Sequence, residues 1–155
     1  MNNPGKTPAS PRPTPPTNKA KAAVQRLVNG LLDELAPEKT LTRSERVPVA
    51  VEQHRSPTGC VLQAADYAVS VSWFDESKGE TLGELHVIVW RGTVARRGAT
   101  RHTKGATVIS EIILHPIEPP EDDKVWRATD GARYDAIGII AKILSLLQEQ
   151  TSAVR

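Results

Sequence analysis

The sequence predicts an α+β protein: an N-terminal amphipathic helix, an antiparallel meander of about five strands, and a C-terminal helix packed on the sheet. Three observations support this fold class. A 3.6-residue apolar period occupies residues 19–36, alternating β-rich segments follow between residues 46 and 128, and a second helical period begins near residue 134. No helical pattern interrupts the strands, so we expect neighbouring strands to pair as hairpins.

The chain of 155 residues has the length of one domain. Residues 1–18 are rich in Pro and Thr and have no apolar period, so we expect a disordered basic leader. Residues 19–150 form the single predicted α+β domain, and residues 151–155 are expected to fray. The first 22 residues contribute four positive charges to a net charge of +2. The remainder is therefore close to neutral, which argues against a globally basic nucleic-acid binder.

The first helix follows Asn18, a plausible N-cap with Thr17 as a close alternative, and stops before Pro37. Its apolar positions recur three and four residues apart, which is typical of an amphipathic helix. They are Ala20, Ala23, Val24, Leu27, Val28, Leu31, Leu32 and Leu35.

The strands begin with residues 46–53, where Pro48 favours an edge position. A short strand is expected at residues 60–65. Residues 66–74 then alternate clearly, which predicts two faces of a strand. Tyr67, Val69, Val71 and Trp73 should face the core, and the opposite face should meet solvent or a shallow groove through Ala68, Ser70, Ser72 and Phe74.

The longest strand signal, residues 82–116, predicts a hairpin that forms the spine of the sheet. Leu85, Val87 and Val89 should point inward, and Gly92 should mark a bulge or bend. The link between the two arms is basic and contains no acid. It offers a candidate polyanion site at Arg96, Arg97, Arg101, His102 and Lys104, although such a link is more often a solvated loop.

The C-terminal region combines a short strand at residues 125–128, an Asp130–Gly131 turn and a helix from about Tyr134. Asp130 is a possible helix cap, and Asp135 suits the first turn of the helix dipole.

Sequence motifs for catalysis are absent, and no P-loop, GxGxxG, GxSxG or HExxH pattern occurs. Cys60 is the only cysteine, and the four histidines are scattered, so we expect no metal and no cofactor. His86 and His115 are candidate neighbours on adjacent strands, near Glu84 or Glu111. A lone cysteine fits a reducing compartment, and no apolar segment reaches membrane-spanning length, so we expect a cytoplasmic protein with no membrane partner. Abundant Ala, Pro, Arg and Thr suggest a bacterial source.

The tryptophans suggest an interaction face. Trp73 belongs with the core set, whereas Trp90 and Trp126 are expected on the opposite sheet face. That candidate face comprises His86, Ile88, Trp90, Ile113 and Trp126. It needs a cover, which a helix, a second subunit or a ligand would provide.

The leading hypothesis is a small non-enzymatic interaction module, an adaptor or accessory protein that binds a protein partner or itself. One alternative is polyanion or nucleic-acid binding through the basic hairpin tip, residues 96–104. Another is an enzyme or carrier with a small-ligand pocket between sheet and helix.

Overall fold

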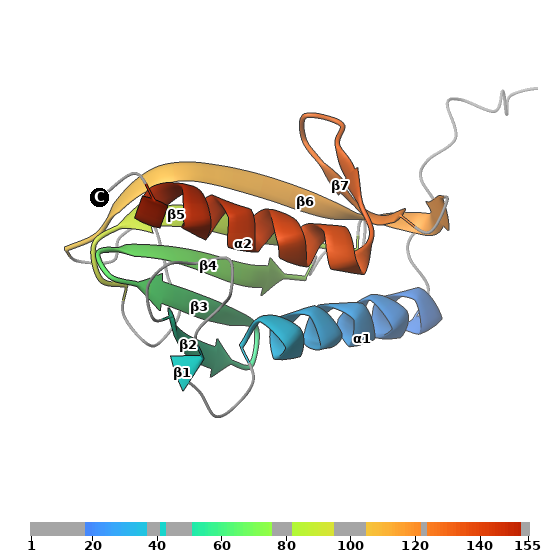
Figure 1. Cartoon of the computed structure of the whole chain (residues 1–155). Coiled ribbons are helices and arrows are strands. Elements are labelled where there is room, and N and C mark those ends of the chain that lie inside the picture. The colour runs from blue at the N-terminus through green and yellow to red at the C-terminus, as the bar shows by residue number, and fades with distance from the viewer. Residues whose placement is uncertain are drawn as a thin grey trace, which may run out of the picture.

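The computed structural model describes residues 18–36, 41–42, 51–75, 82–94, 105–121 and 124–152. Eight strands form one antiparallel sheet whose spatial order is the chain order, β1 to β8 (Figure 1). The strands are β1 (Leu41–Thr42), β2 (Val51–Ser56), β3 (Gly59–Ala64), β4 (Tyr67–Phe74), β5 (Glu84–Arg91), β6 (Thr107–Glu121), β7 (Lys124–Ala128) and β8 (Arg133–Tyr134).

Two helices, α1 (Asn18–Leu35) and α2 (Ala136–Ser152), cover the same face of this sheet. Helix α1 lies over β2 and β3, and α2 lies over β4, β5, β7 and β8 and contacts α1. We call the helix-covered face the inner face and the opposite one the outer face. The α+β class and the packing of both terminal helices on the sheet are confirmed.

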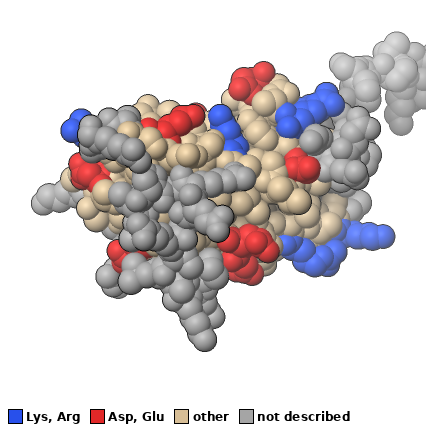
Figure 2. Space-filling view, in the orientation of Figure 1, with Lys and Arg blue, Asp and Glu red and all other residues tan. Residues whose placement is uncertain are grey.

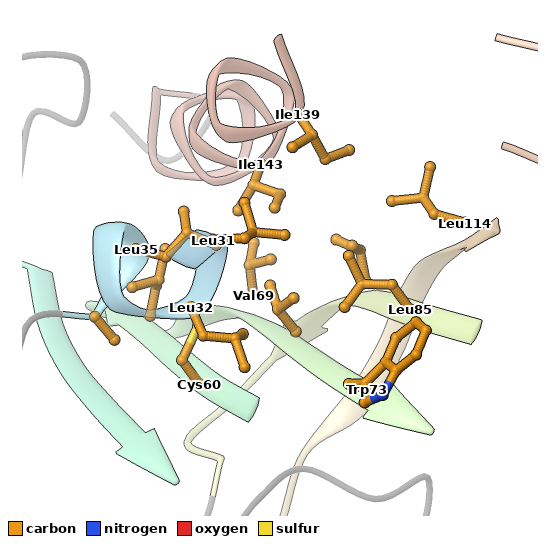
Figure 3. Close-up of a cluster of buried hydrophobic side chains, with 14 of the residues drawn as sticks. Leu31, Leu32, Leu35, Cys60, Val69, Trp73, Leu85, Leu114, Ile139 and Ile143 are labelled. Atoms are coloured by element: carbon orange, nitrogen blue, oxygen red, sulfur yellow. The ribbon is translucent and has the colours of Figure 1, made fainter. Parts of the chain in front are cut away.

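The main core fills the space between the inner face and the helices. Leu31, Leu32 and Leu35 of α1 and Ile139 and Ile143 of α2 point toward the strands (Figure 3). The strands contribute a matching set whose members pair across the sheet, as in Leu62–Val69–Val89 and Trp73–Leu85–Leu114. The inner face of β4 is therefore the one that the sequence pattern predicted.

Polar contacts attach the end of α1 to β2. The amide Nε2 of Gln53 donates a 2.6 Å hydrogen bond to the carbonyl oxygen of Leu35, in the last turn of the helix. Arg55 Nε lies 3.1 Å from Asp33 Oδ1 in the same turn. A helix leaves its last carbonyls without intrahelical partners, so Gln53 satisfies one of them from the neighbouring layer.

Several element boundaries differ from the predicted ones. The sheet has more strands than expected because β1 and β8, of two residues each, carry no alternation that a sequence pattern reveals. Strand β2 starts at Val51, and the earlier part of the predicted strand lies outside the described residues, as does most of the leader. Helix α2 continues through Ser152 because Thr151 is buried and donates to Leu147 O at 3.0 Å.

The start of α2 also differs from the prediction. Asp135 Oδ1 accepts a 2.6 Å hydrogen bond from the backbone N–H of Gly138, which makes Asp135 the N-cap. Asp130 instead accepts from Ala132 N at 2.9 Å, within the turn between β7 and β8. The two aspartates therefore close a turn and begin a helix in succession.

Candidate functional site: the outer face of the sheet

The outer face carries the residues that alternate with the core set. The register aligns His54, Val61, Ser70, Ile88 and Glu111 in one row across β2 to β6. Because both helices lie on the inner face, this face has no helical cover among the described residues.

A second, smaller apolar cluster is nevertheless buried on the outer face. It consists of Val61, Ala68, Ile88, Trp90 and Val94. Trp90 is 0% exposed, and its Nε1 donates a 2.9 Å hydrogen bond to Ser70 Oγ. The expectation that Ala68 and Ser70 meet solvent or a shallow groove is thus wrong, because both are buried beside the indole ring, which needs the Ser70 hydroxyl as its partner.

The side chain of Gln63 organises the edge of this cluster. Its Nε2 lies within hydrogen-bonding distance of the carbonyl oxygens of Ala65, Tyr67 and Gly92, at 2.9, 3.1 and 3.0 Å. Its Oε1 accepts from Val94 N at 3.1 Å. One amide therefore joins the β3–β4 turn to the segment that leaves β5, and it holds Val94 against the outer face.

Gly92 is required at the point where that segment leaves the sheet. Its φ is +110°, a region that disfavours side chains, and a Cβ there would lie 2.5 Å from Gly105 O. The expected bend occurs here, but Thr93 and Val94 do not continue the strand. The register shift lies instead between Val89 and Trp90, opposite β6.

The open part of the outer face lies at the end of the sheet away from the Trp90 cluster. We call this surface the outer strip, and it extends across β4 to β8. It consists of Phe74, Glu84, His86, Ile113, His115, Arg127 and Arg133. Phe74 is 53% exposed, and its ring packs edge-on against His86 with centroids 4.7 Å apart.

Two histidines and two glutamates meet within the outer strip and beside it. His115 Nε2 lies 3.5 Å from Glu84 Oε2, and His86 Nε2 lies 3.9 Å from the same oxygen. His86 Nδ1 is 4.0 Å from Glu111 Oε2. The approach of His86 and His115 across neighbouring strands is present, with Glu84 between them. Among the described residues, no three His, Cys, Asp or Glu side chains are placed to hold a metal ion.

The predicted interaction face divides between the two sides of the sheet. His86, Ile88, Trp90 and Ile113 lie on the outer face. Trp126 lies on the inner face, with its ring 6.0 Å from that of Trp73 in an edge arrangement. The strand of Trp126 is short, and its pairing to β6 is irregular between Pro116 and Glu121, so alternation alone assigned the wrong side.

Three residues of the outer strip were not expected as site residues. Phe74 was assigned to the outer face without a role, and Arg127 and Arg133 received none. The register places these arginines opposite each other on β7 and β8, and places Arg127 opposite His115. Phe74, Arg127 and Arg133 share one surface only because the strands pair in this register. No pattern along the sequence indicates that they lie on the same surface.

The basic link and Cys60 are the other features that the sequence singles out. The basic link, Arg96 to Lys104, lies outside the described residues. Cys60 is 3% exposed on the inner face, where burial raises the pKa of its thiol from 9.0 to about 12 despite the opposing effect of Arg55. A thiol held protonated in an apolar layer is a poor nucleophile.

The helix-covered side carries acidic and basic side chains interspersed among uncharged ones (Figure 2). None of the described helices combines the length and apolarity needed to cross a membrane. The chain matches no protein-family model, no curated protein and no solved structure.

Proposed function

We propose that this protein is a small interaction module that binds a protein partner through the outer face of its sheet. The observation that carries the proposal is the position of both helices on the inner face, while Phe74 is 53% exposed on the outer one. Exposed apolar residues bordered by polar groups are typical of protein-binding surfaces.

The predicted face contributes to this surface in two ways. Ile88 and Trp90 are buried, so they support the strands from within the outer cluster. His86 and Ile113 are partly exposed and lie with Phe74 in the outer strip. The aromatic ring is held by His86, and an ordered aromatic residue loses little side-chain entropy on binding.

Site-specific photocrosslinking tests the proposal. A photoreactive phenylalanine analogue at position 74 is expected to give a covalent adduct with a protein when the full chain is irradiated in the cells that produce it or, after purification, at high protein concentration. The matched control is the same analogue at Ile137, which is 80% exposed on α2 in the opposite layer. Equal adducts at both positions, or none at position 74, would contradict an outer-face interaction surface.

A further inference from the structure

We infer that the partner of the outer strip is a second copy of this chain, packed face to face about a two-fold axis parallel to β6. This inference rests on the proposed function and names the occupant of the same surface. It follows from the order in which charges and the exposed ring cross the sheet.

One row of the outer strip crosses five strands in succession. It contains Phe74 on β4, Glu84 on β5, His115 on β6, Arg127 on β7 and Arg133 on β8. The pairs Phe74–Glu84, His115–Arg127 and Arg127–Arg133 are in register, and Glu84 meets His115 at 3.5 Å. The row therefore has an aromatic ring and an acid at one end and two cations at the other, with His115 in the middle.

This order is complementary to itself. A two-fold rotation about an axis along β6 exchanges β5 with β7 and β4 with β8 between the two copies. Arg127 then faces Glu84 of the second copy, and Arg133 faces Phe74 of the second copy. Each contact occurs twice, as an isologous interface requires. Sheets stacked face to face lie about 10 Å apart, a gap that an arginine and a glutamate extended toward each other can bridge.

Residues near the axis are compatible with this contact. Ile113 and His115 of β6 meet their own counterparts, and Ile113 is partly buried already. Glu111 lies two residues before Ile113 on the same face of β6, and its side chain is only 17% exposed, so little of its carboxylate faces the second copy.

The dimer gives the two arginines favourable contacts with the second copy. Arg127 and Arg133 are exposed and in register on β7 and β8. A carboxylate of a second molecule adds a charged contact to Arg127, and an arginine over an aromatic ring adds a cation–π contact.

The width of the row determines the affinity that we expect for the dimer. Four strand intervals of about 4.8 Å give a width of about 19 Å. A contact of this width belongs to the weak, transient class of interfaces, so association should appear only at high protein concentration. Its charged contacts should weaken with salt.

Sedimentation velocity on the full chain tests the inference at concentrations up to about 500 µM, in low and high salt. Wild type is expected to show a monomer–dimer equilibrium that shifts toward monomer in high salt. Glu84→Arg and Arg127→Glu should each weaken dimerisation about tenfold or more, because each places like charges together twice. The double variant, which restores both pairs in exchanged order, should recover most of the wild-type affinity.

A wild type that stays monomeric at the highest concentration in low salt overturns the inference. So does a dimer that neither single swap weakens, or one that the double variant fails to restore. Circular dichroism and thermal unfolding verify that each variant folds. If a charge swap unfolds the protein, Phe74→Ser and its matched control Ile137→Ser replace it, and only Phe74→Ser should weaken the dimer.

The photocrosslinking experiment separates this inference from the proposed function. An adduct between two copies through position 74 supports both. An adduct with a different protein keeps the proposed function and overturns the inference, and the absence of an adduct overturns the proposed function.

Discussion

Gln63 shows how one side chain determines the shape of the outer face. Its amide nitrogen donates within a group of three carbonyl oxygens that lie in reach, and its amide oxygen accepts from Val94 N, so the contacts join segments from Ala65 to Val94. A backbone group left without a partner when partly buried costs free energy that a solvated group does not. Gln63 therefore stabilises the turn after β3 and the departure from β5 together.

Replacing Gln63 with Leu should lower the free energy of unfolding by about 1–3 kcal/mol, since it removes every one of these hydrogen bonds. Urea unfolding followed by circular dichroism measures the change. The matched control is Gln25→Leu on the exposed side of α1, where Gln25 Nε2 donates a 3.2 Å hydrogen bond to Asn29 Oδ1. That control should change stability by at most about 0.5 kcal/mol, and an equal loss in both variants would contradict the role given to Gln63.

Cys60 should make stability depend on pH above neutrality. The unfolded chain loses the thiol proton near pH 9, whereas burial raises the pKa of the folded thiol to about 12. Stability from this group is therefore fully present below pH 9 and is lost as pH rises toward 12. Within this window the free energy of unfolding of wild type should fall by about 1.4 kcal/mol per pH unit more than that of Cys60→Ala.

Urea unfolding of both proteins at pH 8, 9.5 and 10.5 measures that difference, and the alanine variant corrects for every other group that titrates. Parallel pH profiles would show that the thiol ionises as easily in the folded chain as in the unfolded one. The same burial predicts slow reaction of native Cys60 with a thiol reagent and fast reaction in urea.

At the scale of elements, the N-cap of α2 gives the clearest test. Asp135→Ala removes the acceptor for Gly138 N and should cost about 0.5–2 kcal/mol of stability. Asp130→Ala serves as the control, because its carboxylate closes an exposed turn rather than a helix. In thermal unfolding, Asp135→Ala should have a lower midpoint temperature than Asp130→Ala. The reverse order would contradict the assignment of Asp135 as the N-cap of α2.

The elements that the sequence predicted well are those with long periodic patterns. Helix α1 buries six of its expected apolar positions, and β4 and β5 keep the predicted inner faces. Leu27 is the clearest exception, at 39% exposed, because it lies at the margin of the apolar stripe. Strands β1 and β8 and the side occupied by Trp126 depend on pairing between distant residues, which a local period does not encode.

The candidate site was predictable only in part, for the same reason. His86 and Ile113 were expected on the exposed face, and they lie there. The meeting of Phe74, Glu84, His115, Arg127 and Arg133 depends on the register of five strands. Register follows from the hydrophobic pattern and the turns taken together, so no single segment of the sequence reveals this row.

For the molecule as a whole, the main core predicts one cooperative unfolding transition. Its side chains come from both helices and from strands β2 to β7, so the loss of one element exposes the others. Tryptophan fluorescence, dominated by the buried Trp73, Trp90 and Trp126, and far-UV circular dichroism should give the same urea midpoint. Separate midpoints would show that the outer cluster around Trp90 unfolds independently.

The strands lie in the sheet in the same order as in the sequence, and this has a consequence for how the protein folds. Every strand pairs with its neighbour in sequence, so each hairpin closes a local loop at a small entropic cost. The contact between α1 and α2 is different, because it joins segments near residues 18–35 and 136–152 across most of the chain. The hairpins should therefore form early, and the docking of α1 beside α2 should complete the core last.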